Sequence, residues 1–312
     1  MAASAPAADS PSLGPGSNRV DIQYGGIARS YIVHVPPQAS GEGALPVILN
    51  FHGAGSNATQ QEHYSGMDAT ADRDGFVAVY PNGTGRGTRM LTWNAGGCCA
   101  YAAFHEIDDV GFTRALIDDL ATRVRIDRAR VYATGISNGG MMSFRLGVEA
   151  SDRIAAIAPV EGALVVQTSG PARPMPLMLF NSLDDRYVPY NGRVGLLGRL
   201  SHKTAYPSVP SVDEEVARWR SFDGCPRDPQ VAPALKGAPS SPDEGKSATR
   251  YEWGPCAGGT RIVLWKLAGS GHVWPGAGLN VVWLGPATQV INANDQMWQF
   301  FHNFSVPSGK GS

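Results

Sequence analysis

The pattern Gly-Ile-Ser-Asn-Gly at 135–139 is the part of the sequence that most clearly predicts chemistry. It follows the apolar run 131–134 and precedes a helical segment at 141–149. A serine between two glycines, where a strand turns into a helix, is held on a tight bend that exposes its hydroxyl. The pattern predicts Ser137 as a nucleophile for acyl transfer. The alternative is a glycine-rich turn in which Ser137 only caps the helix.

A serine hydroxyl becomes a nucleophile when a base removes its proton and an acid orients that base. Asp185 and His272 each follow an apolar run that is typical of a strand. The chain order Ser137, Asp185, His272 is the order of hydrolases whose nucleophile lies on a strand-to-helix turn. We therefore predict His272 as the base and Asp185 as the acid, with the neighbouring Asp184 as a rival for the acid role.

Acyl transfer also needs hydrogen-bond donors that face the negative oxygen of the tetrahedral intermediate. An early predicted strand ends in Asn-Phe-His-Gly-Ala-Gly at 50–55, where the glycines leave the backbone free to turn its N–H groups inward. We expect the backbone N–H groups of Ala54 and Asn138 to form the oxyanion hole. His52 adjoins this loop, and we expect it to fix the loop by hydrogen bonds and to have no catalytic role.

Short apolar runs alternate with helical patterns along the chain, and several of the runs lack alternation of apolar and polar residues. Strands of this kind belong to a sheet that is covered on both faces. We predict an α/β fold with a mostly parallel central sheet covered by helices on both faces. Strands are expected at 31–35, 47–51, 77–80, 131–135, 154–160, 177–181 and 262–267, and further helices at 109–124 and 289–304.

Composition sets the limits of function. The 312 residues are 43% apolar and 17% charged, with a net charge of −1, so no global basic field attracts nucleic acid or an anionic membrane. Apolar runs are far shorter than the ~18 residues of a membrane span. We expect one catalytic domain at 19–306, between a disordered segment at 1–18, which lacks the pattern of a signal peptide, and a flexible C-terminus at 307–312.

Four cysteines are present, and none has the spacing of a metal site, so we expect no bound metal. Cys225 and Cys256 bracket a polar segment that could not fold alone, and we expect them to form a disulfide. This disulfide implies a secreted or periplasmic protein whose signal peptide has been removed, and four reduced thiols are the alternative. The adjacent Cys98 and Cys99 form either a vicinal bridge or two buried thiols.

Five ordered blocks resemble the polyhydroxybutyrate depolymerase and feruloyl esterase-like branch of the α/β-hydrolases, from about residue 31 to residue 304. The blocks are His-Gly at 52–53, Trp-Asn-Ala-Gly with Cys-Cys at 93–99, Asp-Asp-Val-Gly-Phe at 108–112, the serine region at 130–142, and Gly-His-Val-Trp-Pro-Gly at 271–276. The resemblance implies the α/β-hydrolase fold, no cofactor, secretion, and polymers or plant cell-wall esters as substrates. It also implies Ser137 as nucleophile, Asp185 as acid and His272 as base, although the residues around Asp185 depart from the family pattern.

Two loops carry basic residues without any acidic residue, and the fold would place both beside the active site. They contribute Arg86, Arg89, Arg186, Arg193, Arg199 and Lys203. This charge predicts an anionic polymer as substrate, and the chain resembles poly(aspartic acid) hydrolases of the same scaffold, which cleave an amide. The alternative is that the arginines and the lysine are solvated surface residues.

Aromatic residues flank the same loops and favour other substrates. Trp93, Tyr187, Tyr190 and Trp274 could stack on an aromatic acyl group, which favours a feruloyl or acetylxylan esterase, with a polyester depolymerase as a further alternative. The apolar run 281–284 is expected to be buried in the monomer, and a lid or a homodimer contact are its alternatives. A non-catalytic binding module with the hydrolase fold is the contrasting class of function.

Overall fold

A computed structural model describes residues 12–41, 43–192 and 209–307. The basic residues Arg193, Arg199 and Lys203 lie outside the described residues. Within them, no helix combines the length and the apolar character that crossing a bilayer requires.

One mixed sheet runs through the described part of the chain in the order β1-β2-β4-β3-β5-β6-β7-β11-β10-β8, and β9 pairs with β10. The six strands from β4 to β11 are paired in parallel, which confirms the predicted mostly parallel sheet. The strands are β1 (Gly16–Tyr24), β2 (Ile27–Val35), β3 (Leu45–Phe51), β4 (Val77–Pro81), β5 (Ile126–Ile136), β6 (Ala156–Val160), β7 (Leu177–Ser182), β8 (Gln230–Val231), β9 (Leu235–Lys236), β10 (Ser247–Trp253) and β11 (Ile262–Ala268).

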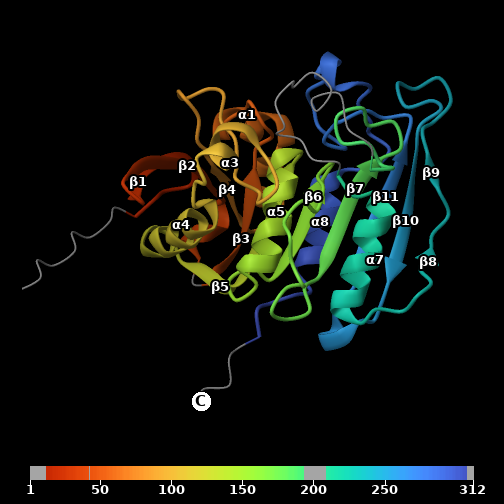
Figure 1. The fold of residues 1–312 in the computed structure, drawn as a ribbon. Helices are drawn as coiled ribbons and strands as arrows, with labels where there is room; N and C mark the ends of the chain where they lie inside the picture. Colours follow the sequence, from red (N-terminus) through yellow and green to blue (C-terminus); the bar gives the residue numbers. More distant parts are fainter. Residues whose placement is uncertain (1–11, 42, 193–208, 308–312) are drawn as a thin grey trace, which may run out of the picture.

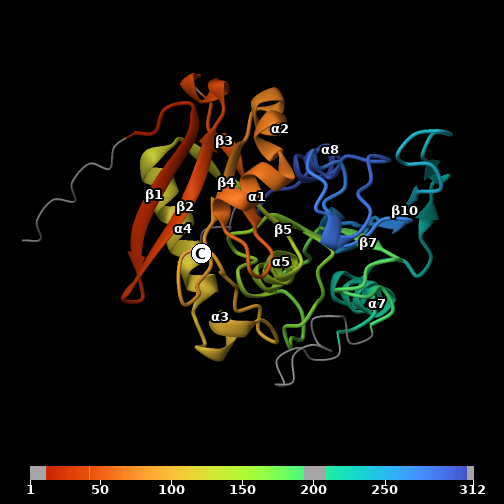
Figure 2. The same ribbon diagram turned by 90° about the horizontal axis from the view of Figure 1, so that it is seen from above.

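Helices cover both faces of this sheet, as predicted. Figure 2 shows α4, α5 and α7 on one face and α1, α2 and α8 on the other. Each face has its own apolar core, in which Phe112, Phe144 and Trp219 lie on the first face and Met67, Met297 and Phe301 on the second. The helices are α1 (Ala58–Ser65), α2 (Met67–Asp74), α3 (Ala100–Phe104), α4 (Asp109–Arg123), α5 (Asn138–Glu149), α7 (Val212–Asp223) and α8 (Ala293–Phe301), with short 3-10 helices η1 (Pro37–Ser40), η2 (Ala257–Gly259) and η3 (Val282–Leu284).

Several boundaries differ from the sequence prediction, and two of these differences have a local physical cause. Strand β1 begins at Gly16, inside the segment 1–18 that was expected to be disordered, because residues 16–24 pair with residues 27–35 through the two-residue turn Gly25-Gly26. Both glycines have positive φ (58° and 77°), as a tight hairpin turn requires. The closing helix, predicted at 289–304, begins only at Ala293, because the Asn292 side chain caps it by accepting from the Asp295 N–H.

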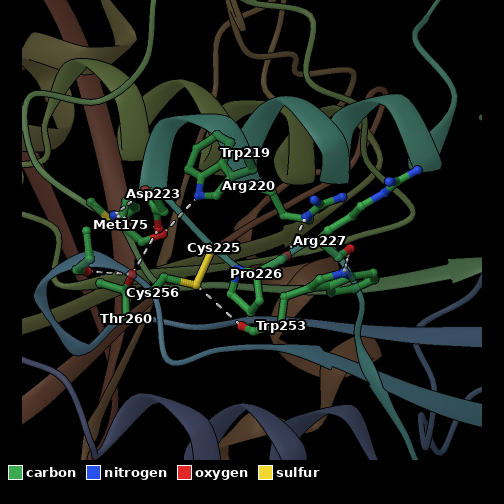
Figure 3. The surroundings of a disulfide bond; sticks show 11 residues. Met175, Trp219, Arg220, Asp223, Cys225, Pro226, Arg227, Trp253, Cys256 and Thr260 are labelled. Atoms are coloured by element: carbon green, nitrogen blue, oxygen red, sulfur yellow. Dashed lines mark hydrogen bonds between the residues drawn. A yellow bond between two sulfur atoms is a disulfide. The ribbon is translucent and has the colours of Figure 1, made fainter.

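The expected disulfide joins Cys225, just beyond α7, to Cys256 after β10, and it fastens the last helix of the first face to the edge of the sheet (Figure 3). Beside it, the buried carboxylate of Asp223 accepts from the Met175 N–H (3.0 Å) and the Thr260 hydroxyl (3.2 Å). Cys98 and Cys99 form a second, vicinal disulfide, which settles their pairing.

Parallel pairing brings the ends of several strands to one edge of the sheet, the upper edge in Figure 1. The loop after β3, Ser137 after β5 and the loop after β7 all lie at this edge, as does the loop after β11 that carries His272. This is the edge at which open α/β sheets bind their ligands.

Candidate active site

Ser137 occupies a strained bend between β5 and α5. Its φ of 58° and ψ of −122° lie outside the regions that residues other than glycine prefer. A Cβ atom at Gly135 or at Gly139 would collide with the Phe51 carbonyl, so both neighbours of the bend must be glycine. The Ser137 N–H donates to the Val160 carbonyl (2.9 Å), which holds the bend while the side chain stays partly exposed.

His272 and Asp185 meet above the ends of β11 and β7. Nδ1 of His272 lies 2.6 Å from Oδ2 of Asp185, and both side chains are buried. The other oxygen of Asp185 accepts from the backbone N–H groups of Tyr187 (2.7 Å) and Val188 (3.0 Å). Burial alone would raise the pKa of Asp185, but the charge and hydrogen bond of His272 outweigh it and hold this pKa below its usual value. Asp185 thus fixes the ring with Nε2 as the proton acceptor.

Asp184, the rival for the acid role, bonds a backbone N–H group and not the imidazole of His272. Oδ2 of Asp184 accepts from the Gly269 N–H (2.7 Å), and the side chain is exposed to solvent. Asp184 therefore braces the loop that leads to His272, whereas Asp185 bonds the imidazole itself.

The loop after β3 is fixed by His52, as expected from the sequence. Nδ1 of His52 lies 2.8 Å from the Gly53 carbonyl, and Nε2 accepts from the Gly83 N–H (3.0 Å). Burial lowers the pKa of His52 to about 4, so the ring is neutral, with its proton on Nδ1. Because the peptide is planar and trans, a Gly53 carbonyl that faces His52 turns the Ala54 N–H in the opposite direction.

Trp93 links this loop to the serine bend. The buried side chain of Asn138 accepts from the Trp93 N–H (2.8 Å) and donates to the Trp93 carbonyl (3.0 Å). The Trp93 indole N–H donates to the His52 carbonyl (3.0 Å). Trp93 is fully buried, so the prediction that it binds substrate is wrong: its ring belongs to the core beneath the site.

Comparison with known proteins decides the family. Residues 29–213 match the family described as esterase PHB depolymerase, which is more than half of the chain. The chain belongs to this family. Membership confirms the resemblance drawn from the sequence.

Relatives of this esterase PHB depolymerase family member include feruloyl esterase B of Piromyces equi, 32% identical over 78% of the chain. A bifunctional acetylxylan esterase/xylanase of Neocallimastix patriciarum is 29% identical over 76% of the chain. The chain spans 42% and 30% of the lengths of these two relatives. An acetyl xylan esterase from Aspergillus awamori has a TM-score of 0.52 at 12% identity, covers 91% of this chain and 99% of its own, and shows the shared fold alone.

The aromatic residues predicted to bind substrate have different surroundings in the structure. Trp274 is 1% exposed and its indole N–H donates to Asn294 (3.0 Å), so its assignment to substrate binding is also wrong: it fills the core of the second face. Tyr190 is buried as well. Tyr187 is partly exposed, and its ring centroid lies 5.2 Å from that of His272, which makes it the aromatic residue of this set that adjoins the site.

Three of the basic residues are exposed on the surface. Arg86, Arg89 and Arg186 are exposed and form no ion pair with any residue of the described ranges. The loop that carries Arg86 and Arg89 is tied to the loop after β3, because the Gly55 N–H donates to the Leu91 carbonyl (2.8 Å). Arg186 directly follows Asp185.

The two central residues of the apolar run 281–284 are exposed, which overturns the expectation that the monomer buries this run. Val282 is 79% exposed and Trp283 is 76% exposed. This segment nevertheless touches the site, because the Leu284 carbonyl accepts from the His272 N–H (2.7 Å) and the Trp283 carbonyl accepts from the Tyr187 hydroxyl (2.8 Å).

Sequence reasoning missed one residue of the site, Glu161. It directly follows β6, is fully buried, and its Oε2 accepts from the Ser182 N–H (3.1 Å). Its carboxylate, that of Asp185 and the ring of His272 bring potential ligand atoms within 4.8 Å of one another. Because Asp185 and His272 are already bonded to each other, this arrangement is that of an acid–base chain and does not offer three free metal ligands. An acidic residue directly after a wholly apolar strand was the available signal.

Proposed function

We propose that this protein hydrolyses carboxylic esters through Ser137, His272 and Asp185. The observation that carries the proposal is the 2.6 Å hydrogen bond between His272 and Asp185, at the same sheet edge as the strained Ser137. Nε2 of His272 takes the proton of the Ser137 hydroxyl as Oγ attacks the ester carbonyl. The same imidazole then protonates the leaving alcohol, and water releases the acyl group by the reverse sequence.

The backbone N–H groups of Ala54 and Asn138 would stabilise the tetrahedral oxyanion. The loop of Ala54 adjoins the serine, because a Cβ atom built on Gly53 lies 3.5 Å from the Ser137 Cβ. His52 holds the Gly53 carbonyl, and the Asn138 side chain holds Trp93, so both peptides are fixed before substrate binds. A donor that needs no reorganisation contributes roughly 3 to 4 kcal/mol to the stability of the transition state.

The test is hydrolysis of a soluble aryl ester by wild-type protein and by the Ser137→Ala and Ser143→Ala variants. Ser143 is the matched control, since it lies on α5 and its hydroxyl donates to the Gly139 carbonyl (2.9 Å). We expect Ser137→Ala to lose at least about 1,000-fold in kcat and Ser143→Ala to retain activity. A Ser137→Ala variant that hydrolyses the ester at the wild-type rate would overturn the proposal. Absence of hydrolysis by the wild type would favour a binding module.

An anionic polymer such as poly(aspartic acid) is the second candidate substrate. It is favoured by the unpaired guanidinium groups of Arg86, Arg89 and Arg186 around the site, which would hold side carboxylates while Ser137 attacks a backbone amide. The name of the Piromyces relative favours a neutral aromatic ester instead, for which Tyr187 offers a stacking surface.

Chain-length analysis of poly(aspartic acid) separates these substrates. If the polymer is the substrate, wild type shortens it, and Arg186→Gln lowers kcat/KM for the polymer by about 3-fold to 10-fold without changing hydrolysis of a neutral ester. Arg125→Gln is the control, because this exposed arginine precedes β5 at the opposite edge of the sheet. Cleavage of methyl ferulate together with an intact polymer would exclude the polymer.

We also propose a secreted or periplasmic location. Two disulfides leave no free thiol among the four cysteines, and such bonds persist in oxidising compartments. The protein is denatured without a reductant and titrated with a thiol reagent, which should detect no free thiol. Four reactive thiols would contradict this location.

A further inference from the structure

Glu161 is held in an unfavourable place behind the proposed acid. Its backbone φ is 46°, in the left-handed region that glycine favours, and its side chain is wholly buried. The neighbouring Gly162 packs against the backbone of Gly140 in α5. The surrounding structure therefore holds Glu161 in this unfavourable conformation. Strained residues held in this way are typical of functional sites.

The hydrogen bonds of the two carboxyl groups are unequal. Asp185 receives three hydrogen bonds, from His272 and from the N–H groups of Tyr187 and Val188. Glu161 receives one, at Oε2 from Ser182, and its Oε1 is buried with no donor among the described residues. A carboxyl oxygen of Glu161 and one of Asp185 lie within 4.8 Å of each other, so two buried carboxyl groups share one site.

Two buried carboxylates at this separation cannot both be ionised at modest cost. Burial first, and the charge of Asp185 second, raise the pKa of Glu161 well above its usual value. Three donors stabilise the anion of Asp185, whereas one stabilises that of Glu161, so the shared proton belongs on Glu161. Among the described residues, the hydroxyl of Tyr64 also interacts electrostatically with Glu161, and it accepts from the Trp274 N–H (3.0 Å).

We propose that Glu161 is a neutral carboxylic acid at neutral pH, and that its Oε1–H donates a hydrogen bond to Asp185. Glu161 is then a positioning residue: it completes the hydrogen bonds of Asp185, holds that carboxylate toward His272 and keeps the buried site at a single negative charge. Its effect on the reaction rate rests on the proposed function, whereas its protonation state does not.

Three variants test the role in catalysis. Glu161→Gln keeps an acceptor for Ser182 and a neutral donor for Asp185, and we expect kcat and the acid limb of the pH profile of kcat/KM to stay as in wild type. Glu161→Met removes the donor and should lower kcat by roughly 10-fold with little change in KM. Glu215→Gln is the control, since Glu215 is equally buried but bonds the Leu164 N–H (2.8 Å). An ionised Glu161 is indicated instead if Glu161→Gln shifts the acid limb to lower pH, because the imidazolium then loses a nearby charge; that result overturns the proposal.

A second measurement reads the proton directly and needs no activity. Protein with ¹³C-labelled glutamate carboxyl groups should show, at pH 6, a carboxyl signal in the protonated range that is absent from Glu161→Gln and present in Glu215→Gln. The same signal should remain in Ser137→Ala, so failure of the proposed catalysis would leave it intact. If Glu161→Gln does not fold, the wild-type protein and Glu215→Gln still test the proposal. Two carboxyl signals in the protonated range in wild type, of which one is lost in Glu215→Gln, support it. The proposal is overturned if the wild-type spectrum shows no protonated glutamate carboxyl group other than that of Glu215.

Discussion

Nδ1 of His272 lies 2.6 Å from Oδ2 of Asp185, although 87 residues separate them in the chain. The ends of β7 and β11 bring them together, because these strands pair in parallel from Ile262 and Leu177 onward. The bond selects one tautomer of the ring and stabilises its charged form.

This bond predicts that Asp185→Asn is far more damaging than Asp184→Asn. An amide at 185 would favour the wrong tautomer of His272, and we expect kcat to fall by about 10⁴-fold. Asp184→Asn removes a charge from a side chain that only accepts from Gly269, and it should keep kcat within about 3-fold of wild type. Steady-state kinetics on one aryl ester compare the two variants. An equal loss of kcat in both would show that the acid role of Asp185 is wrongly assigned.

The neutral ring of His52 predicts a loss of rate without a loss of binding. His52→Phe removes the hydrogen bonds to the Gly53 carbonyl and from the Gly83 N–H, so the Ala54 peptide is free to turn. We expect kcat to fall about 100-fold while KM changes little. His63→Phe is the control, because His63 is exposed on α1 and bonds the Thr59 carbonyl (2.7 Å). Wild-type kcat in folded His52→Phe would show that this peptide does not act in catalysis.

The serine bend was predictable because its glycines are required by close contact with the Phe51 carbonyl, and such a requirement leaves a mark in the sequence. The sequence favoured Asp185 as the acid but left Asp184 as a rival, since neighbouring carboxylates are told apart only by the turn of the chain after β7. Trp93 was misplaced because aromatic residues beside a site also fill the core beneath it, and its contacts come from residues 41 and 45 positions away. Those contacts depend on the whole sheet and leave no local pattern.

The Cys225–Cys256 disulfide should account for a large part of the stability. It spans 31 residues, and in the chain-entropy model its loss lowers the free energy of unfolding by roughly 3 to 4 kcal/mol. Chemical denaturation of the Cys225→Ala/Cys256→Ala double variant measures this loss. The Cys98→Ala/Cys99→Ala double variant closes no chain loop and should lose much less by this mechanism. An equal loss in both would refute the loop-closure explanation.

Burial of Glu215 predicts how stability depends on pH. Burial raises its pKa to about 8 in the folded state, from 4.5 in the unfolded chain. The folded state therefore binds more protons between these pH values, and the free energy of unfolding falls as the pH rises through this window, on the order of 5 kcal/mol in total. Denaturation of wild type and Glu215→Gln at pH 5 and pH 8 should show this decline in wild type and a smaller one in the variant. The same decline in the free energy of unfolding in wild type and in Glu215→Gln would be inconsistent with a buried, titrating Glu215.

The most direct test of the account is covalent labelling with a fluorophosphonate, followed by peptide mapping. We predict one adduct per chain, located on Ser137, with complete loss of ester hydrolysis and no adduct on the folded Ser137→Ala variant. An adduct on another residue, or full activity after Ser137 has been labelled, would contradict Ser137 as the nucleophile.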